Sequence, residues 1–202
     1  MFRILAGGAL LLSFVFAVLG IAIVAGPPDT EARGAMLPAA DCPAPCLLGL
    51  RPGVTTAEKA AAILANHPWI RESSPPITGS GTLRWAWNGQ QPSLFGRGGG
   101  YGEVEIRDGM VYLIRILTPT PFAEFWLLMG APEKGTIGRS RVMPDTFQTH
   151  RAVYPAYGLE LKTVILQNGD MKNFWEAPVE ILVTADTDIA YNYTLPCWVA
   201  CG

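Results

Sequence analysis

Charged residues are scarce in this chain. They make up 16% of the 202 residues, and the formal net charge is only −2. A chain without a basic excess lacks the electrostatic footprint of a protein that binds nucleic acid. We therefore expect no nucleic-acid partner.

Motifs of known catalytic centres are also missing from the sequence. Histidine occurs twice, as His67 and His150, and neither lies in an H-E-x-x-H pattern, while no G-x-S-x-G elbow is present. The glycine run "FGRGGGYG" at residues 95–102 leads into a strand pattern, whereas a dinucleotide-binding loop leads into a helix. We expect no catalytic residue, no metal site and no cofactor.

A long uncharged run occupies the start of the sequence. Residues 4–25 contain no charged side chain, and a helix needs about 20 apolar residues to cross a bilayer. The run predicts a transmembrane anchor, or an uncleaved signal, over residues 1–26. The alternatives are a buried core helix and a signal cleaved after Ala25 or Gly26, which the prolines at 27 and 28 disfavour.

The charges around this run predict its orientation. Arg3 precedes the run, and Asp29 and Glu31 follow it. The positive-inside rule then places the N-terminus in the cytoplasm and the C-terminal domain outside it. We expect a single-pass membrane protein that contacts the lipid bilayer through its N-terminal helix. Residues 27–40 contain three prolines and no periodicity, which is typical of a linker.

Four cysteines form two spaced pairs, Cys42 with Cys46 and Cys197 with Cys201. In an extracytoplasmic domain an even number of cysteines indicates disulfides, and four cysteines allow three pairings. The sequence does not choose between local bridges and bridges that tie the two ends of the domain together. A zinc site or a redox-active dithiol built from these C-x₃-C pairs is the alternative.

A capped helix opens the domain in "GLRPGVTTAEKAAAILANHPW", residues 49–69. Thr55 followed by Glu58 matches a capping box, and Pro68 ends the helical pattern. Small or apolar residues form one face of this helix: Ala57, Ala60, Ala61 and Leu64. We expect that face to pack closely on a sheet.

Alternating apolar and polar residues predict antiparallel strands after this helix. The pattern covers residues 83–87, 102–107 and 110–117, with Asp108-Gly109 as a hairpin turn. A second unit repeats the plan, with Thr120 as helix cap, Pro121 as first helical residue and strands at 151–155, 158–166, 178–183 and 189–196. The predicted fold is α+β, an N-terminal transmembrane helix followed by two helix-plus-antiparallel-sheet repeats, at about 41–117 and 118–202 of an extracytoplasmic domain spanning 41–202.

Aromatic residues supply the candidate binding residues. The chain has 6 tryptophans, and Trp85 and Trp87 share one face of a predicted strand. They either pack in the core or form a binding surface, because tryptophan and tyrosine are enriched in both places. Together with Tyr101, in the glycine-rich segment that follows, they form the candidate binding surface.

The helix cap and the order of elements resemble a known family. The segment with Gly53, Val54, Thr55, Leu64 and Pro68 resembles the "G-M-T-x-x-x-V/A-x-x-x-L-G-x-P" start of the small lipoproteins of outer-membrane β-barrel assembly, the SmpA/OmlA family. Ala60 or Ala61 takes the family's Val/Ala position, and Leu128, Gly130 and Pro132 match the motif in the second unit. The doubled architecture also looks like that of the β-lactamase-inhibitor protein. The chain lacks a lipobox cysteine and adds two cysteine pairs. The resemblance implies a binding scaffold without a catalytic centre.

Taken together, the sequence predicts a membrane-anchored extracytoplasmic interaction or scaffold domain that binds a protein partner and is not an enzyme. The alternative is a thiol-redox or metal-binding envelope protein that uses the C-x₃-C pairs. Oxidised, inert cysteines would argue against that alternative.

Overall fold

The computed structural model describes residues 34, 36, 41–75, 78–96, 100–142, 145–166 and 171–185. The predicted anchor at 1–26, most of the linker at 27–40, Cys197, Cys201 and the predicted strand at 189–196 lie outside these residues. Among the described residues, no helix has the length and apolar character needed to cross a bilayer.

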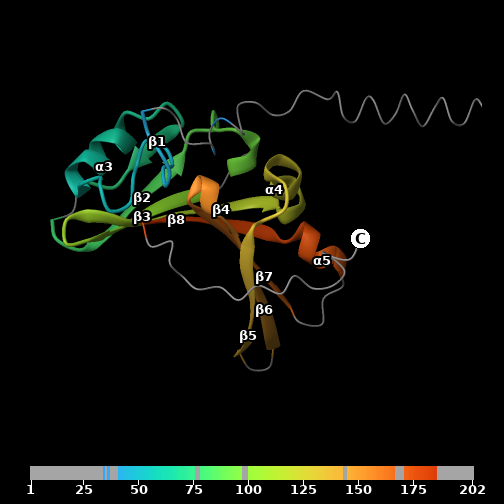
Figure 1. Ribbon diagram of the computed structural model, residues 1–202. Coiled ribbons are helices and arrows are strands. Elements are labelled where there is room, and N and C mark those ends of the chain that lie inside the picture. The colour runs from blue at the N-terminus through green and yellow to red at the C-terminus, as the bar shows by residue number, and fades with distance from the viewer. Residues whose placement is uncertain are drawn as a thin grey trace, which may run out of the picture. The chain divides into compact units, whose positions relative to one another are not determined.

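One antiparallel sheet of eight strands dominates the described structure, with the strand order β1-β2-β3-β4-β8-β7-β6-β5 (Figure 1). The first half of the chain supplies four strands: β1 (Ile70–Ser73), β2 (Gly81–Trp87), β3 (Tyr101–Arg107) and β4 (Met110–Pro121). The second half supplies the other four: β5 (Lys134–Val142), β6 (Asp145–Tyr154), β7 (Leu159–Leu166) and β8 (Pro178–Thr184). Strands that are adjacent in the sequence therefore pair with each other, except β4 and β5; β4 pairs with β8 instead.

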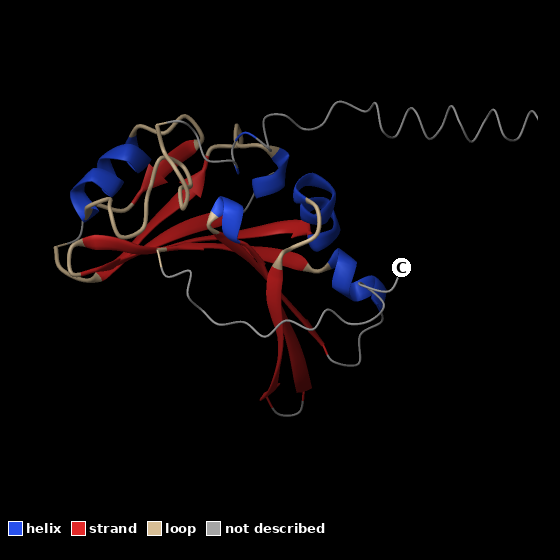
Figure 2. Ribbon diagram, in the orientation of Figure 1, coloured by secondary structure: helices blue, strands red, loops and turns tan. Residues whose placement is uncertain are grey.

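Between residues 41 and 185, the described part of the chain forms three short α-helices and two single turns of 3₁₀ helix beside the sheet (Figure 2). They are α3 (Ala57–Ala65), α4 (Phe122–Met129), α5 (Met171–Glu176), η1 (Ser93–Phe95) and η2 (Pro155–Tyr157). Helix α3 contacts β1 and β4, while α4 and α5 contact each other and β4.

The predicted fold class is wrong for the described residues. β4 pairs with β8 from Leu113↔Thr184 to Thr118↔Val179, so strands from both halves belong to one sheet instead of two helix-plus-sheet repeats. No described helix supports the transmembrane helix that the same prediction placed at the N-terminus. Alternation in a sequence shows that a strand has one covered face, but it carries no information about which distant strand lies beside it.

The core lies on one face of the sheet, as the alternation predicts. Buried residues from six strands point to this face and meet the helices: Leu83, Trp85, Trp87, Val104, Ile106, Ile114, Ile116, Ile181, Val183, Leu161 and Ala152. In α3, the predicted face of Ala57, Ala60, Ala61 and Leu64 is buried. That part of the sequence prediction is confirmed.

The start of each predicted helix is displaced by one residue. Thr56 is the N-cap of α3, and its side chain accepts a hydrogen bond from the Lys59 amide at 3.3 Å. Thr55, the predicted cap, instead accepts from the Arg51 amide at 2.9 Å and holds the preceding turn. In α4 the N-cap is Pro121, because β4 continues through that residue. Neighbouring threonines offer the same hydroxyl, so the pattern alone does not choose between them.

The predicted hairpin at Asp108-Gly109 is confirmed. Both residues have positive φ, 50° and 75°, which is the requirement of a two-residue type I′ turn. Strands β1 and β5 and helix α5 were not predicted. The β5 sequence "KGTIGRSRV" has two glycines and little alternation, and α5 has only 6 residues.

Candidate binding face

The second face of the sheet is covered by no described helix, and we call it the open face. It carries the residues that alternate with the core residues along β2, β3, β4, β8 and β7. Several of them are charged: Arg84, Glu103, Glu105, Arg115, Glu180, Glu160 and Lys162. A sheet with one packed face and one polar face has this composition. The open face is not solvated throughout, because Leu182 and Glu160, which lie opposite each other on it, are buried, each 7% exposed.

Ion pairs link these charges across five neighbouring strands. The Glu103 carboxylate on β3 forms ion pairs with Arg84 of β2 at 3.3 Å and with Arg115 of β4 at 2.9 Å. The Glu180 carboxylate on β8 forms ion pairs with the same Arg115 at 2.9 Å and with Lys162 of β7 at 2.7 Å. We call this run of five side chains the charge ladder. Each carboxylate bridges two cations, so the ladder ties the first-half strands to the second-half strands.

A further ion pair continues the pattern on the next strand. Arg151 of β6 contacts Glu160 of β7 at 2.7 Å. In register, Arg151 lies opposite Lys162, the last member of the ladder. Two cations therefore face each other between β7 and β6, and the strict alternation of charge ends at Lys162.

Apolar side chains lie beside the charge ladder. Tyr101 pairs in register with Ala86 on one side and Leu117 on the other. Tyr101 is 45% exposed and Leu117 is 38% exposed. Tyr101, Ala86 and Arg84 also line an open hollow of about 510 Å³ that reaches Ser73 and Ser74 at the β1 edge. The hollow thus brings together an exposed aromatic ring, a small apolar side chain and the largely exposed guanidinium of Arg84, which pairs with Glu103.

The three predicted binding residues do not lie together. Trp85 and Trp87 are 2% and 7% exposed and belong to the core. Their rings meet edge to face at 5.7 Å, and Trp87 stacks on Phe95 at 5.6 Å. Only Tyr101 is on the open face. The structure therefore supports the core interpretation of the two tryptophans and keeps Tyr101 as a surface residue.

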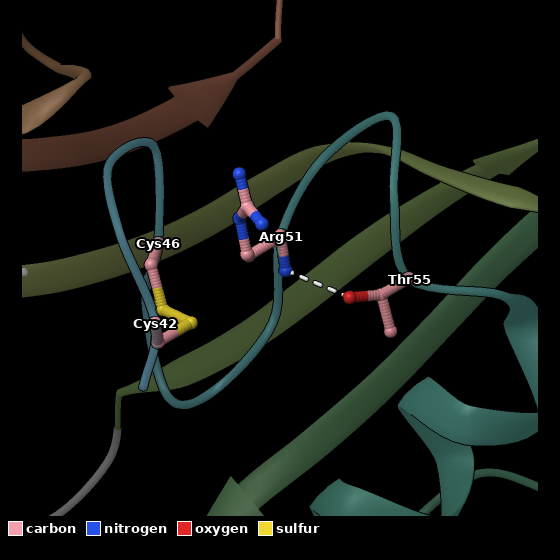
Figure 3. Close-up of a disulfide and its surroundings, with 4 residues drawn as sticks. All are labelled: Cys42, Cys46, Arg51 and Thr55. Carbon is pink, nitrogen blue, oxygen red and sulfur yellow. Dashed lines mark hydrogen bonds between the residues drawn. A yellow bond between two sulfur atoms is a disulfide. The ribbon is translucent and has the colours of Figure 1, made fainter. Parts of the chain in front are cut away.

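Of the four cysteines predicted to form disulfides, Cys42 and Cys46 are among the described residues, and Cys197 and Cys201 lie outside them. Cys42 and Cys46 form a local bridge across a sequence separation of 4 (Figure 3). The bridge does not tie this end of the domain to the C-terminal cysteines. Closing so short a loop stabilises the fold by about 2 kcal/mol in the chain-entropy model. Both sulfur-bearing residues are nearly buried.

The disulfide loop joins the N-terminal segment to the second half of the sheet. Pro45, inside the loop, lies so close to Gly158 that a Cβ at 158 would come within 2.6 Å of the proline ring. Gly158 follows η2 with a φ of 64°, in the left-handed region. Beside the bridge, the hydrogen bond from the Arg51 amide to Thr55 holds the turn into α3 (Figure 3).

Both histidines have environments that favour the neutral form. His150 is buried between Phe122 at 5.4 Å and Phe174 at 4.9 Å, and this burial lowers its pKa to about 4. His67 contacts Trp69 at 4.9 Å, and partial burial also lowers its pKa. Among the described residues, no three of the side chains that bind metals gather in one place.

Sequence reasoning missed the central members of the charge ladder, Arg115, Glu180 and Lys162. A signal was present. Arg115 interrupts the apolar run "MVYLIRIL", and a charge in the middle of a paired strand needs a partner on the strands beside it. Finding that partner required the β4–β8 pairing. Comparison with protein-family models, curated proteins and solved structures finds no match for this chain.

Proposed function

We propose that the described domain is a non-catalytic interaction domain whose open face binds a protein partner. The observation that carries this proposal is the row of Ala86, Tyr101 and Leu117 beside the charge ladder. Tyrosine is a frequent contributor to binding energy, and a polar border around an apolar centre is typical of interfaces. The implication of the SmpA/OmlA resemblance, a binding scaffold, agrees with this function.

An extracytoplasmic location is part of the proposal. The Cys42–Cys46 disulfide supports it, because such bonds persist in oxidising compartments and are rare in the cytosol. Attachment to a membrane through residues 4–25 stays a prediction from the sequence alone.

The redox and metal alternative gains no support from the described pair. Cys42 and Cys46 are bonded to each other and nearly buried, whereas reactive thiols are accessible and have lowered pKa values. Thiol counting on the native protein tests this point directly. Reactive thiols at 42 and 46 would revive the alternative.

Site-specific photo-crosslinking in living cells tests the open face. A photoreactive residue at Tyr101 or Leu117 should give the same protein adduct, identified by mass spectrometry. The matched control is Leu127 on α4, which is 85% exposed and does not lie on the open face. The control position should not give that adduct.

Binding of the identified partner to purified variants completes the test. We expect Tyr101→Ser to weaken binding about tenfold or more, as for a typical binding hot spot, while Leu127→Ser leaves it unchanged. Identical adducts from all three positions, or equal affinities for both variants, would refute the open face as the binding surface.

A further inference from the structure

The two edges of the sheet differ in a way that points to a second binding site. At one edge, β1 has 4 residues, and its pairing with β2 is irregular between Ile70 and Glu72. At the other edge, β5 has 9 residues and pairs with β6 without interruption from Lys134↔Val153 to Val142↔Asp145. Short or bulged edges resist further pairing, whereas a long regular edge invites it.

The outer edge of β5 has no partner strand among the residues that the structure describes. It is the last strand in the order of the sheet, and no described strand lies beyond it. The strand contains no proline, so every residue keeps its backbone N–H group. In Figure 1 the β5–β6 hairpin extends away from β1, β2 and β3. An added strand would meet a continuous row of backbone donors and acceptors.

The side chains of β5 define the chemistry of the added strand. The sequence of β5 has three basic residues and no acidic one. Lys134 and Arg139 are exposed. Ile137, 37% exposed, lies two residues before Arg139 and therefore on the same face of the strand. The edge combines backbone hydrogen-bonding groups with an apolar position and a cation next to it.

We propose that β5 binds an extended, acidic segment of a partner protein by strand addition. The added strand places an apolar residue opposite Ile137 and a carboxylate opposite Arg139, at positions two residues apart. Charge decides against a second copy of this chain, because two β5 strands would gather basic residues at one edge with no acidic residue of β5 to pair with them. The site uses different residues from the open face, so it goes beyond the proposed function and can fail without it.

A pair of synthetic peptides tests this proposal on the full chain. Each peptide has nine residues, and threonine occupies every second position. The positions between the threonines hold either isoleucine or a charged residue. The charged residue is glutamate in one peptide and lysine in the other. We expect the glutamate peptide to bind about tenfold more tightly than the lysine peptide. Hydrogen exchange should show new protection of β5 backbone amides when the glutamate peptide is bound.

A charge reversal on the edge provides the specific control. Arg139→Glu should lower the affinity for the glutamate peptide about tenfold, so that the variant binds the lysine peptide more tightly than the glutamate peptide. Lys59→Glu removes an exposed cation from α3 instead, and it should leave both affinities unchanged.

Three results would overturn the proposal: equal affinity for the two peptides, protection confined to residues outside β5, or the same response from both charge reversals. Concentration-dependent protection of β5 without any peptide would also overturn it, because the occupant would then be a second copy of the chain. Crosslinking at Tyr101 is independent of each of these results.

Discussion

At the scale of single residues, the buried His150 makes the stability of the folded protein depend on pH. It is buried among aromatic rings, and burial lowers its pKa to about 4 from an ordinary 6.5. The unfolded chain therefore binds a proton more readily than the folded protein does. The contribution of neutral His150 to stability is fully present above pH 6.5 and is lost progressively as the pH falls from 6.5 to 4.

We expect the free energy of unfolding to fall by about 2 kcal/mol between pH 7 and pH 5 because of His150 alone. Denaturant unfolding across this range measures the fall. His150→Phe should remove most of the slope while leaving Phe122 and Phe174 packed. His67 has a pKa lowered in the same direction, so the comparison is best made in a His67→Gln background. An unchanged slope in His150→Phe would contradict the assignment.

A second residue-scale prediction concerns Gly102, which lies opposite Trp85 in register. A Cβ at 102 would overlap the Trp85 indole, which is buried in the core, so the ring or the strand would have to shift. We expect Gly102→Ala to destabilise the protein by about 1–3 kcal/mol or more. Gly138→Ala is the matched control, because a Cβ there meets no atom within 4 Å. Equal unfolding midpoints for the two variants would count against the packing described for Trp85.

The placement of aromatic residues shows a limit of sequence reasoning at this scale. The alternation in residues 83–87 correctly put Trp85 and Trp87 on one face of a strand. It did not say whether that face meets the core or the solvent, since a strand at the middle of a sheet presents the same period to both. Tyr101 lies on the open face with its register partners, Ala86 and Leu117, and it is 45% exposed there.

At the scale of elements, the charge ladder fastens β4 to β8. Glu180 bridges Arg115 and Lys162, and all three side chains are partly shielded from solvent. Single exposed ion pairs contribute little, but a network with a shared carboxylate contributes more because fewer side chains must be ordered for each contact. The charge ladder could not be predicted from the sequence, because its members come from strands that are far apart in the chain.

We expect Glu180→Gln to lower the free energy of unfolding by about 1 kcal/mol at low salt and by less at high salt. A double-mutant cycle with Arg115→Met measures the coupling between the two positions. Glu72→Gln provides the control, because Glu72 forms an ion pair with its exposed neighbour Arg71 and with no other residue that the structure describes. A coupling energy near zero, or the same loss in the control, would show that the ladder does not stabilise the sheet.

At the scale of the whole described domain, the sequence predicted most strands but not their arrangement. Helix α3, the Asp108-Gly109 hairpin and the alternating patterns of β2, β3, β4, β7 and β8 follow from local rules. Pairing of β4 with β8 does not, because it joins residues about 60 to 70 positions apart in the chain. Local patterns therefore suggested two separate units, whereas non-local hydrogen bonds make one sheet.

This difference has a measurable consequence for unfolding. The β4–β8 ladder, the shared core and the contact of Pro45 with Gly158 all cross the boundary near residue 118. Two weakly coupled units would unfold in separate steps, but one sheet with a common core should unfold in a single cooperative transition. Tryptophan fluorescence and far-ultraviolet circular dichroism should give coincident denaturation curves. Since five of the tryptophans belong to described residues on both sides of the boundary, fluorescence reports on both halves. Two resolved transitions, one for each half, would restore the picture of independent units.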